Sequence, residues 1–199
     1  TIEKLKTFKY TKFISFVDSS PEEGFNKLLI EDQSNLKILI GSDDYLSENY
    51  LEEFYKSAKK LTNRGIKNFI LMPLFYKKFG AGFFNIDFPL PIFILNFIGI
   101  SRGIGFGIYK EDGEITTFNK NIKYASDFEF LIRCLKSGYY FKYVPCKYYH
   151  SKNGRSSKNW FKALIEEREI SLKYNKNYFL KKFIIFLFTI KYIYKKQSF

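Results

Sequence analysis

The sequence contains very little cysteine and histidine. Its 199 residues include two cysteines, Cys134 and Cys146, and one histidine, His150. Two cysteines exclude a disulfide framework, and this supply of Cys and His cannot form a structural zinc site in any usual spacing. We therefore expect a protein of the reducing cytoplasm.

Acidic residues are also scarce, since 20 Asp and Glu stand against 33 Lys and Arg, for a formal net charge of +13. Such a charge favours anionic surroundings: nucleic acid, acidic lipid or a phosphorylated substrate. Charge alone does not choose among these, and much of the excess is Lys scattered among Phe, Tyr, Ile and Asn. An AT-rich coding sequence gives the same composition, so we give the charge little weight.

We also expect no signal peptide at the start, because Thr1 to Lys4 lacks the apolar core segment that such a peptide has. What the chain does have is core-forming residues: 46% hydrophobic and 21% aromatic, with 24 Phe and 16 Tyr. That excludes a disordered chain and fits one folded domain. We interpret the aromatic residues as core rather than as a stacking platform, and expect no nucleic-acid partner.

Hydrophobic periodicity predicts an alternation of strands and helices. We expect strands at 12–17, 36–40, 66–75 and 139–144, one or two further strands within 76–107, and helices at 21–29, 47–64, 126–137, 159–174 and 178–195. Ser47 and Ser126 are expected N-caps and Gly138 the residue after a helix C-cap. The order of a strand, a helix and a second strand along the chain indicates an α/β layered domain with parallel pairing of its strands.

Two adjacent carboxylates, Asp43 and Asp44, follow the apolar run of the second strand in the stretch IGSDDYL. Neighbouring carboxylates repel unless a cation or donors compensate. In an open α/β sheet, ligands gather beyond the carboxyl ends of strands, so this pair could hold Mg²⁺ or Mn²⁺ and, through the metal, a diphosphate. Alternatively, both are ordinary acids of a turn and a helix start.

Other chemistry-bearing residues lie in the second half of the chain. Asp127 falls in the first turn of a helix, where the helix dipole favours a carboxylate that can accept a proton; plain helix capping is the alternative. His150 is a candidate base or metal ligand, or simply a surface residue. The segment GRSS, which contains Arg155 and Ser156, offers donors for phosphate oxygens, or forms an ordinary capped loop before a helix.

Taken together, these stretches resemble the family 2 glycosyltransferases, nucleotide-sugar enzymes of the GT-A fold. Four segments carry the resemblance in the family's order: residues 18–27, which end in GFNK, IGSDDYL at 40–46, YASDFEFLIR at 124–133 with Gly138-Tyr139 after it, and YHSKNGRSS at 149–157. The first keeps Asp18, Asn26 and Lys27 in register but replaces the family's Gly and inner Asp.

The resemblance implies a fold and a function. The fold would be a GT-A-like, Rossmann-like mixed sheet flanked by helices, with C-terminal helices after it. The chain would transfer a sugar with inversion from a nucleotide-sugar donor, a UDP- or GDP-sugar, to a glycan or lipid-linked acceptor. Such an enzyme would act in surface polysaccharide or glycan biosynthesis.

The resemblance also implies roles for single residues. Asp44 would bind the metal, Mg²⁺ or Mn²⁺, with Asp43 beside it contacting metal or ribose. Asp127 would deprotonate the acceptor hydroxyl. His150 and Arg155 would approach the diphosphate or the metal. Asp18, Asn26, Lys27 and Ser156 would also bind substrate.

This chain departs from the family pattern in two ways. Members normally have a strand, helix and strand for the nucleotide base well ahead of the Asp18 segment, whereas 17 residues precede Asp18 here. The resemblance thus implies an N-terminally truncated domain: a fragment, an inactive product that serves as a binding or membrane-associated module, or one part of a pocket that another chain completes. Gly41 also stands where many relatives have Asn or Asp.

The last segment, residues 181–196, is apolar in the middle and basic at both ends. It is shorter than the roughly 20 apolar residues that span a bilayer. It could lie in a membrane interface, on the inner face of a membrane, or pack on the domain as a terminal helix. We therefore divide the chain into a partial GT-A-like domain at 1–176 and a basic, aromatic helix at 177–199.

Overall fold

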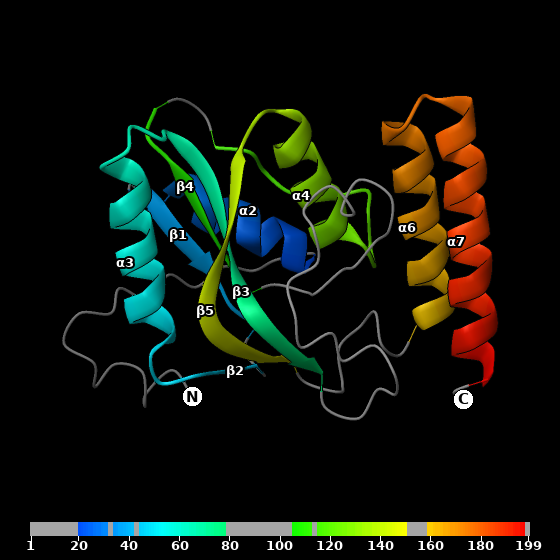
Figure 1. Cartoon of the computed structure of the whole chain (residues 1–199), viewed down its shortest axis with the longest axis horizontal. Coiled ribbons are helices and arrows are strands. Elements are labelled where there is room, and N and C mark those ends of the chain that lie inside the picture. The colour runs from blue at the N-terminus through cyan, green and yellow to red at the C-terminus, as the bar shows by residue number, and fades with distance from the viewer. Residues whose placement is uncertain are drawn as a thin grey trace.

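The computed structural model describes residues 20–31, 34–41, 44–78, 105–112, 115–150 and 159–197 (Figure 1). The elements in chain order are α2 (Pro21–Glu31), β1 (Leu36–Leu39), β2 (Tyr45–Leu46), α3 (Tyr50–Thr62), β3 (Asn68–Lys78), β4 (Phe106–Lys110), α4 (Ser126–Lys136), β5 (Tyr140–His150), α6 (Trp160–Tyr174) and α7 (Tyr178–Gln197). The expected helices are all present, and the expected strand at 12–17 lies outside the described residues.

The strands form one mixed sheet in the order β1-β4-β3-β5-β2. The expected parallel pairing is right for β3 and β5 but wrong for β1, because β4 lies antiparallel between β1 and β3. Two antiparallel steps restore the direction, so β1, β3 and β5 all run the same way. Their carboxyl ends therefore meet at one side of the sheet, which we call the carboxyl edge.

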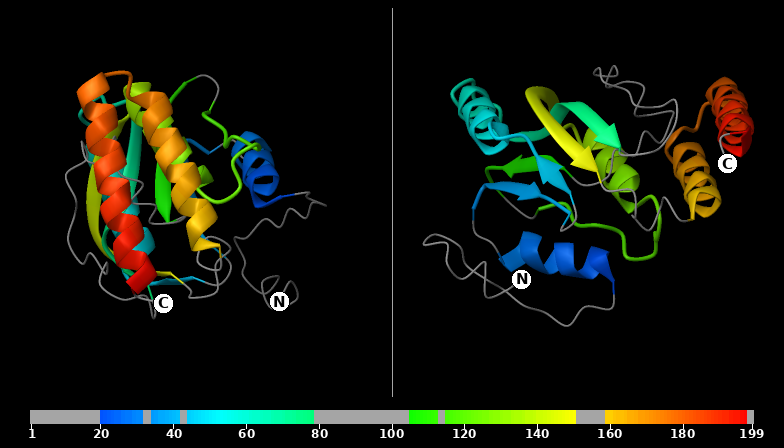
Figure 2. Two further views of the ribbon diagram at one scale, coloured as in Figure 1. Left: turned by 90° about the vertical axis from the view of Figure 1, so that its right-hand side faces the viewer. Right: turned by 90° about the horizontal axis from the view of Figure 1, so that it is seen from below.

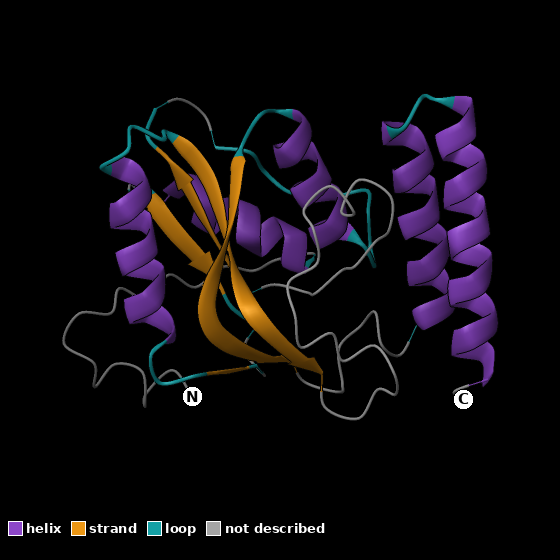
Figure 3. Cartoon of the chain, viewed as in Figure 1, coloured by secondary structure: helices purple, strands orange, loops and turns teal. Residues whose placement is uncertain are grey.

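Helices cover both faces of this sheet (Figure 3). Along β3, Phe69 and Leu71 pack toward α3, while Ile70 and Met72 pack toward α4, as the period of two residues in a strand requires. The view from below shows α3 on one side of the sheet and α2 and α4 on the other (Figure 2). The mixed α/β class expected from the sequence is the observed one.

Two predicted helix caps are wrong and one is right. The N-cap of α3 is Asn49, and Ser47 instead accepts the backbone N–H of Lys147 on β5 at 3.1 Å. The N-cap of α4 is Ala125, because the Ser126 hydroxyl is used in a tertiary contact described below. At the other end of α4, Gly138 has φ of 82° and closes the helix as expected.

Two strands extend beyond their predicted ends. β3 runs to Lys78 and pairs in parallel with β5, which runs on to His150. Residues 145–150, expected in part as a loop, are therefore strand. Apolar periodicity stops earlier than the ladder does, since backbone pairing continues where side chains become polar.

The last two helices form a hairpin beside α4, with α6 next to the domain and α7 outermost (Figures 1 and 2). Ile170 of α6 packs against Ala125, Phe128 and Ile132 of α4. Ile184 and Phe188 of α7 pack on Leu164 of α6. Within the described ranges, no helix combines the length and the hydropathy needed to cross a bilayer.

Candidate functional site

The carboxyl edge brings together chain segments that are far apart in sequence. β1 ends there, and the amino end of α4 lies toward it, because a tight turn joins the carboxyl end of α4 to the start of β5 at the opposite side of the sheet. The amino end of α2 meets the amino end of α4 through a hydrogen bond from the Ser126 hydroxyl to Oε1 of the buried Glu22, 3.0 Å long. In open α/β sheets this is the edge where ligands bind.

Asp44 lies between β1 and β2, immediately before β2, and is held by a residue of β5, the strand with which β2 pairs. The hydroxyl of Tyr148, on β5, donates to Oδ2 of Asp44. The same phenol oxygen accepts the backbone N–H of Gly41 at 3.3 Å. The Tyr148 ring is fully buried, so one rigid side chain fixes both the end of β1 and the Asp44 carboxylate.

The packing around the Tyr148 ring is tight. Gly105 has φ of 125°, and a Cβ built there would lie 2.6 Å from the ring. A second buried phenol, that of Tyr50, donates to the Gly105 carbonyl at 2.9 Å, and burial raises the pKa of Tyr50 far above its usual value. We refer to Gly41, Asp44, Tyr50, Gly105 and Tyr148 as the Asp44 corner.

Asp127 lies in the first turn of α4 and is 9% exposed. Its Oδ1 accepts the backbone N–H of Phe128 at 2.9 Å. A carboxylate at this position is stabilised in its charged form by the amino end of the helix dipole. The position expected from the sequence is therefore the observed one, and its role as a base stays a prediction.

A carboxylate from α6 caps the segment that leads into α4. Glu166 accepts three consecutive backbone N–H groups, those of Lys123, Tyr124 and Ala125, at 3.2, 2.6 and 3.1 Å. They belong to the N-cap of α4 and the two residues before it, so Glu166 ties the chain that enters α4 to α6. We refer to Glu22, Ala125, Ser126, Asp127 and Glu166 as the Asp127 corner.

Asn26 joins α2 to the segment between β4 and α4. Its side-chain amide donates to the carbonyl of Phe118 at 2.9 Å and accepts the N–H of the same residue at 2.6 Å. Lys27, the next residue, lies 3.8 Å from Glu23. The Asn26 amide is thus used within the protein, and the substrate-binding role of Asn26 and Lys27 stays a prediction.

Glu129 and Arg133, which belong to the segment at 124–133, form a structural pair. The buried Glu129 carboxylate accepts Nη2 of Arg133 at 2.9 Å and the hydroxyl of Tyr174 on α6 at 2.7 Å. The Arg133 guanidinium also donates to the Thr117 carbonyl at 2.6 Å. This network fixes α4 against α6 and therefore fixes the start of α4 at the carboxyl edge.

Several predicted site residues lie outside the described residues: Asp18, Asp43, Arg155, Ser156 and the side chain of His150. The backbone of His150 ends β5, at the same edge as Asp44. Sequence reasoning missed Glu22, Glu166 and Tyr148, which hold the two corners. Tyr148 immediately precedes the segment at 149–157, whereas nothing in the local sequence indicates that Glu166 has a role at the site.

The donor chemistry at the edge suits a hard dication. The Asp44 carboxylate is an oxygen ligand of the kind that Mg²⁺ and Mn²⁺ take, and Tyr148 orients it as an outer partner would. Within the described residues, no three His, Cys, Asp or Glu side chains gather closely enough to hold a metal ion. Asp44 is thus the described part of the predicted metal site.

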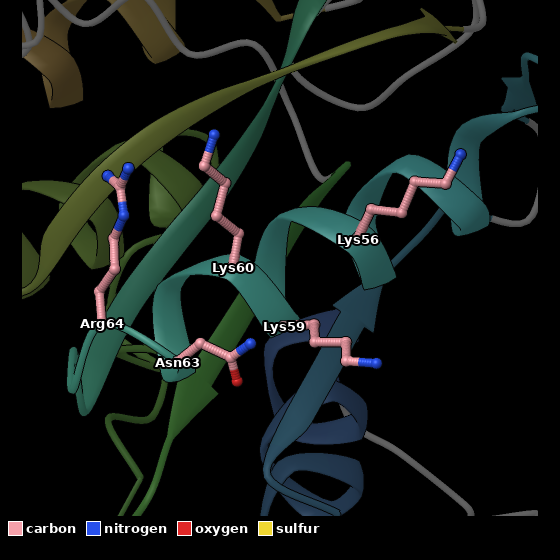
Figure 4. Close-up of a pocket in the computed structure, with 5 residues that line it drawn as sticks. All are labelled: Lys56, Lys59, Lys60, Asn63 and Arg64. Atoms are coloured by element: carbon pink, nitrogen blue, oxygen red, sulfur yellow. The ribbon is translucent and has the colours of Figure 1, made fainter.

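A basic surface depression lies away from this edge, along the later turns of α3 (Figure 4). Its lining residues are Lys56, Lys59, Lys60, Asn63 and Arg64. Partial burial, together with the charges of Lys60 and Arg64, lowers the pKa of Lys142 on β5. The depression contains no acid or base suited to transfer chemistry, so we place the candidate site at the carboxyl edge.

No protein-family model matches the sequence, and no curated protein matches it. Among solved structures, the chain is similar to the crystal structure of S. aureus TarS 1–349, a GT-A glycosyltransferase, with 16% sequence identity and a TM-score of 0.47. The similarity covers 76% of this chain and 44% of the TarS chain. The chain therefore spans less than half of the TarS structure that it matches.

Proposed function

We propose that this chain carries the catalytic edge of an inverting glycosyltransferase. The donor would be a UDP- or GDP-sugar, and the acceptor a hydroxyl of a glycan or of a lipid-linked sugar. One observation supports the proposal above others: Asp44, held by Tyr148 of β5, and the first turn of α4, whose start is tied to α2 by the Ser126–Glu22 hydrogen bond, both lie toward the carboxyl edge. Four segments resembling one family, in that family's order, agree with it.

The chemistry requires one base and a stabilised leaving group. The Asp127 carboxylate would take the proton of the acceptor hydroxyl as the acceptor oxygen attacks the anomeric carbon. The bond from that carbon to the diphosphate oxygen would break on the opposite face, so the configuration inverts and the nucleoside diphosphate leaves. Asp44, with Asp43, would hold Mg²⁺ or Mn²⁺, which supplies positive charge to the leaving diphosphate.

Substitution of Asp127 tests the base assignment. Asp127→Asn keeps the shape of the side chain and removes its basicity, so we expect transfer to fall by about 10²–10⁴-fold while folding is kept. Asp112→Asn is the matched control, because Asp112 is an exposed acid in the turn after β4. Full transfer activity in Asp127→Asn would refute this role.

Substitution of Asp44 tests the metal assignment without any assay of transfer. Isothermal titration with UDP and then GDP, with and without Mn²⁺, should give metal-dependent binding that Asp44→Ala loses and Asp112→Asn keeps. Binding that is equally strong without metal, or that survives in Asp44→Ala, would contradict the assignment. A folded chain that binds neither nucleotide would instead favour the inactive binding module.

A further inference from the structure

The outermost helix, α7, exposes a continuous stripe of large apolar side chains. The stripe repeats at steps of four and three residues, so it follows one face of the helix. Its members are between 47% and 80% exposed: Phe179, Phe183, Phe186, Ile190 and Ile193. Figure 2 shows α7 at the outside of the molecule, with α6 between it and the sheet.

The stripe is not the face with which α7 packs on the domain. Ile184 and Phe188 are buried against Leu164 of α6, and the ring of Tyr192 lies 6.2 Å from that of Trp160. α7 is therefore apolar on two sides, one of which is already covered. A helix that is apolar beyond its packed face needs a second apolar environment.

The charge of the helix indicates what that environment is. α7 contains five Lys and neither Asp nor Glu. Lys181 and Lys182 are exposed near its amino end, where Nζ of Lys182 lies 4.7 Å from the Tyr178 ring centroid. Pairing of two copies through this stripe would bring lysines against lysines, which repel. An anionic lipid surface satisfies both the aromatic stripe and the lysines.

We propose that α7 docks this protein on an anionic bilayer surface. The helix lies in the plane of the interface, with the stripe buried among the headgroups and upper acyl chains and the lysines at the phosphates. This inference does not depend on the proposed function, because it uses no residue of the carboxyl edge. For a transferase with a lipid-linked acceptor, the same docking would bring the acceptor to the enzyme.

Vesicle flotation of the full chain tests the proposal. The protein should float with vesicles of phosphatidylcholine mixed with phosphatidylglycerol, and much less with phosphatidylcholine alone. Phe183→Glu with Phe186→Glu should lower the partition coefficient by about a hundredfold, because two apolar contacts are lost and two negative charges are added. Lys181→Glu with Lys182→Glu should lower it by at least about thirtyfold and weaken the preference for the anionic lipid.

The matched control changes two exposed apolar residues elsewhere by the same chemistry. Leu51→Glu with Tyr55→Glu, on α3, alters the charge equally and should leave flotation unchanged. Emission of the single Trp160, which lies against α7, verifies that the hairpin is intact in each variant. Absence of flotation of the wild-type chain, or equal loss in the α3 control, would overturn the proposal. A dimer in solution that Phe183→Glu with Phe186→Glu dissociates would assign the stripe to a second copy instead.

Discussion

The two carboxylates at the carboxyl edge are held in different ways. Asp44 is oriented by the hydroxyl of one buried tyrosine, Tyr148, 104 residues away in sequence. Asp127 is held by its own helix, whose start is fixed by carboxylates of α2 and α6. The Asp44 corner therefore depends on packing around an aromatic ring, and the Asp127 corner depends on hydrogen bonds to backbone and hydroxyl groups. Substitutions that change packing should act on the first corner, and those that remove a polar group on the second.

The largest effect is expected from Gly105→Ala. The new Cβ would lie 2.6 Å from the Tyr148 ring, at a residue whose φ is 125°. Strain and displacement of the ring should lower the free energy of unfolding by about 3 kcal/mol and abolish metal-dependent nucleotide binding. Urea unfolding and titration with UDP and Mn²⁺ measure the two effects.

Gly65→Ala separates strain from the clash. Gly65 also has a positive φ, of 75°, but a Cβ there meets no atom within 4 Å. We expect a loss of about 1 kcal/mol and unchanged nucleotide binding. Equal effects of the two substitutions would mean that the Tyr148 ring does not limit the Asp44 corner.

Glu166→Ala should act on the other corner. The substitution removes the acceptor of three backbone N–H groups ahead of α4, so we expect the free energy of unfolding to fall by about 2 kcal/mol. Transfer activity should fall while metal-dependent binding at Asp44 is kept. Glu169→Ala, an exposed acid of the same helix, should change neither quantity. Loss of nucleotide binding in Glu166→Ala would show that the two corners are not separable.

How far the sequence predicts this structure differs between the two corners. The helix that bears Asp127 follows from local periodicity and from Gly138, so its position could be predicted. Its supports could not, because Glu22 and Glu166 belong to elements that only the tertiary fold brings to α4. A serine ahead of a helix predicts a cap, yet Ser126 donates to Glu22, since a tertiary acceptor competes with the local backbone donors.

The sheet shows the same limit. The apolar runs that form β1 and β3 could be predicted, but their separation by β4 depends on a pairing between distant segments. Asp44 was a candidate because two acids follow a strand. Its partner Tyr148 was not, because in a sequence with 16 Tyr a buried phenol cannot be distinguished from the others.

Tyr148→Phe should have a smaller effect than Gly105→Ala. It keeps the buried ring and removes only the hydroxyl that orients Asp44. Removal of such an outer partner typically weakens metal binding by about tenfold, so we expect that loss in Mn²⁺ affinity with little change in stability. Tyr139→Phe is the matched control, because the Tyr139 hydroxyl lies near Thr116, 3.4 Å away, at the far end of β5. A Mn²⁺ affinity unchanged by Tyr148→Phe would remove Tyr148 from the site.

The smallest effect concerns the two cysteines, of which Cys146 lies on β5, the strand of Tyr148, and Cys134 lies on α4, the helix of Asp127. Cys146 packs with Tyr148 and α3, and Cys134 packs on α4 with Phe130 and Leu131. Burial raises the pKa of both thiols from 9.0 to about 12. Each thiol therefore stabilises the fold below pH 9 while it stays protonated, and this contribution is lost as the pH rises from about 9 toward 12.

Because the thiolate is the reactive form, alkylation at neutral pH should be slow and should report local opening near each cysteine. Gly105→Ala should speed labelling of Cys146 but not of Cys134, and Glu166→Ala should do the reverse. Mass spectrometry of the labelled peptides measures both rates in one sample, so each corner serves as the control for the other. If both labelling rates rise together in both variants, the protein opens only as a whole. The difference between a corner held by packing and one held by hydrogen bonds would then not extend to local opening.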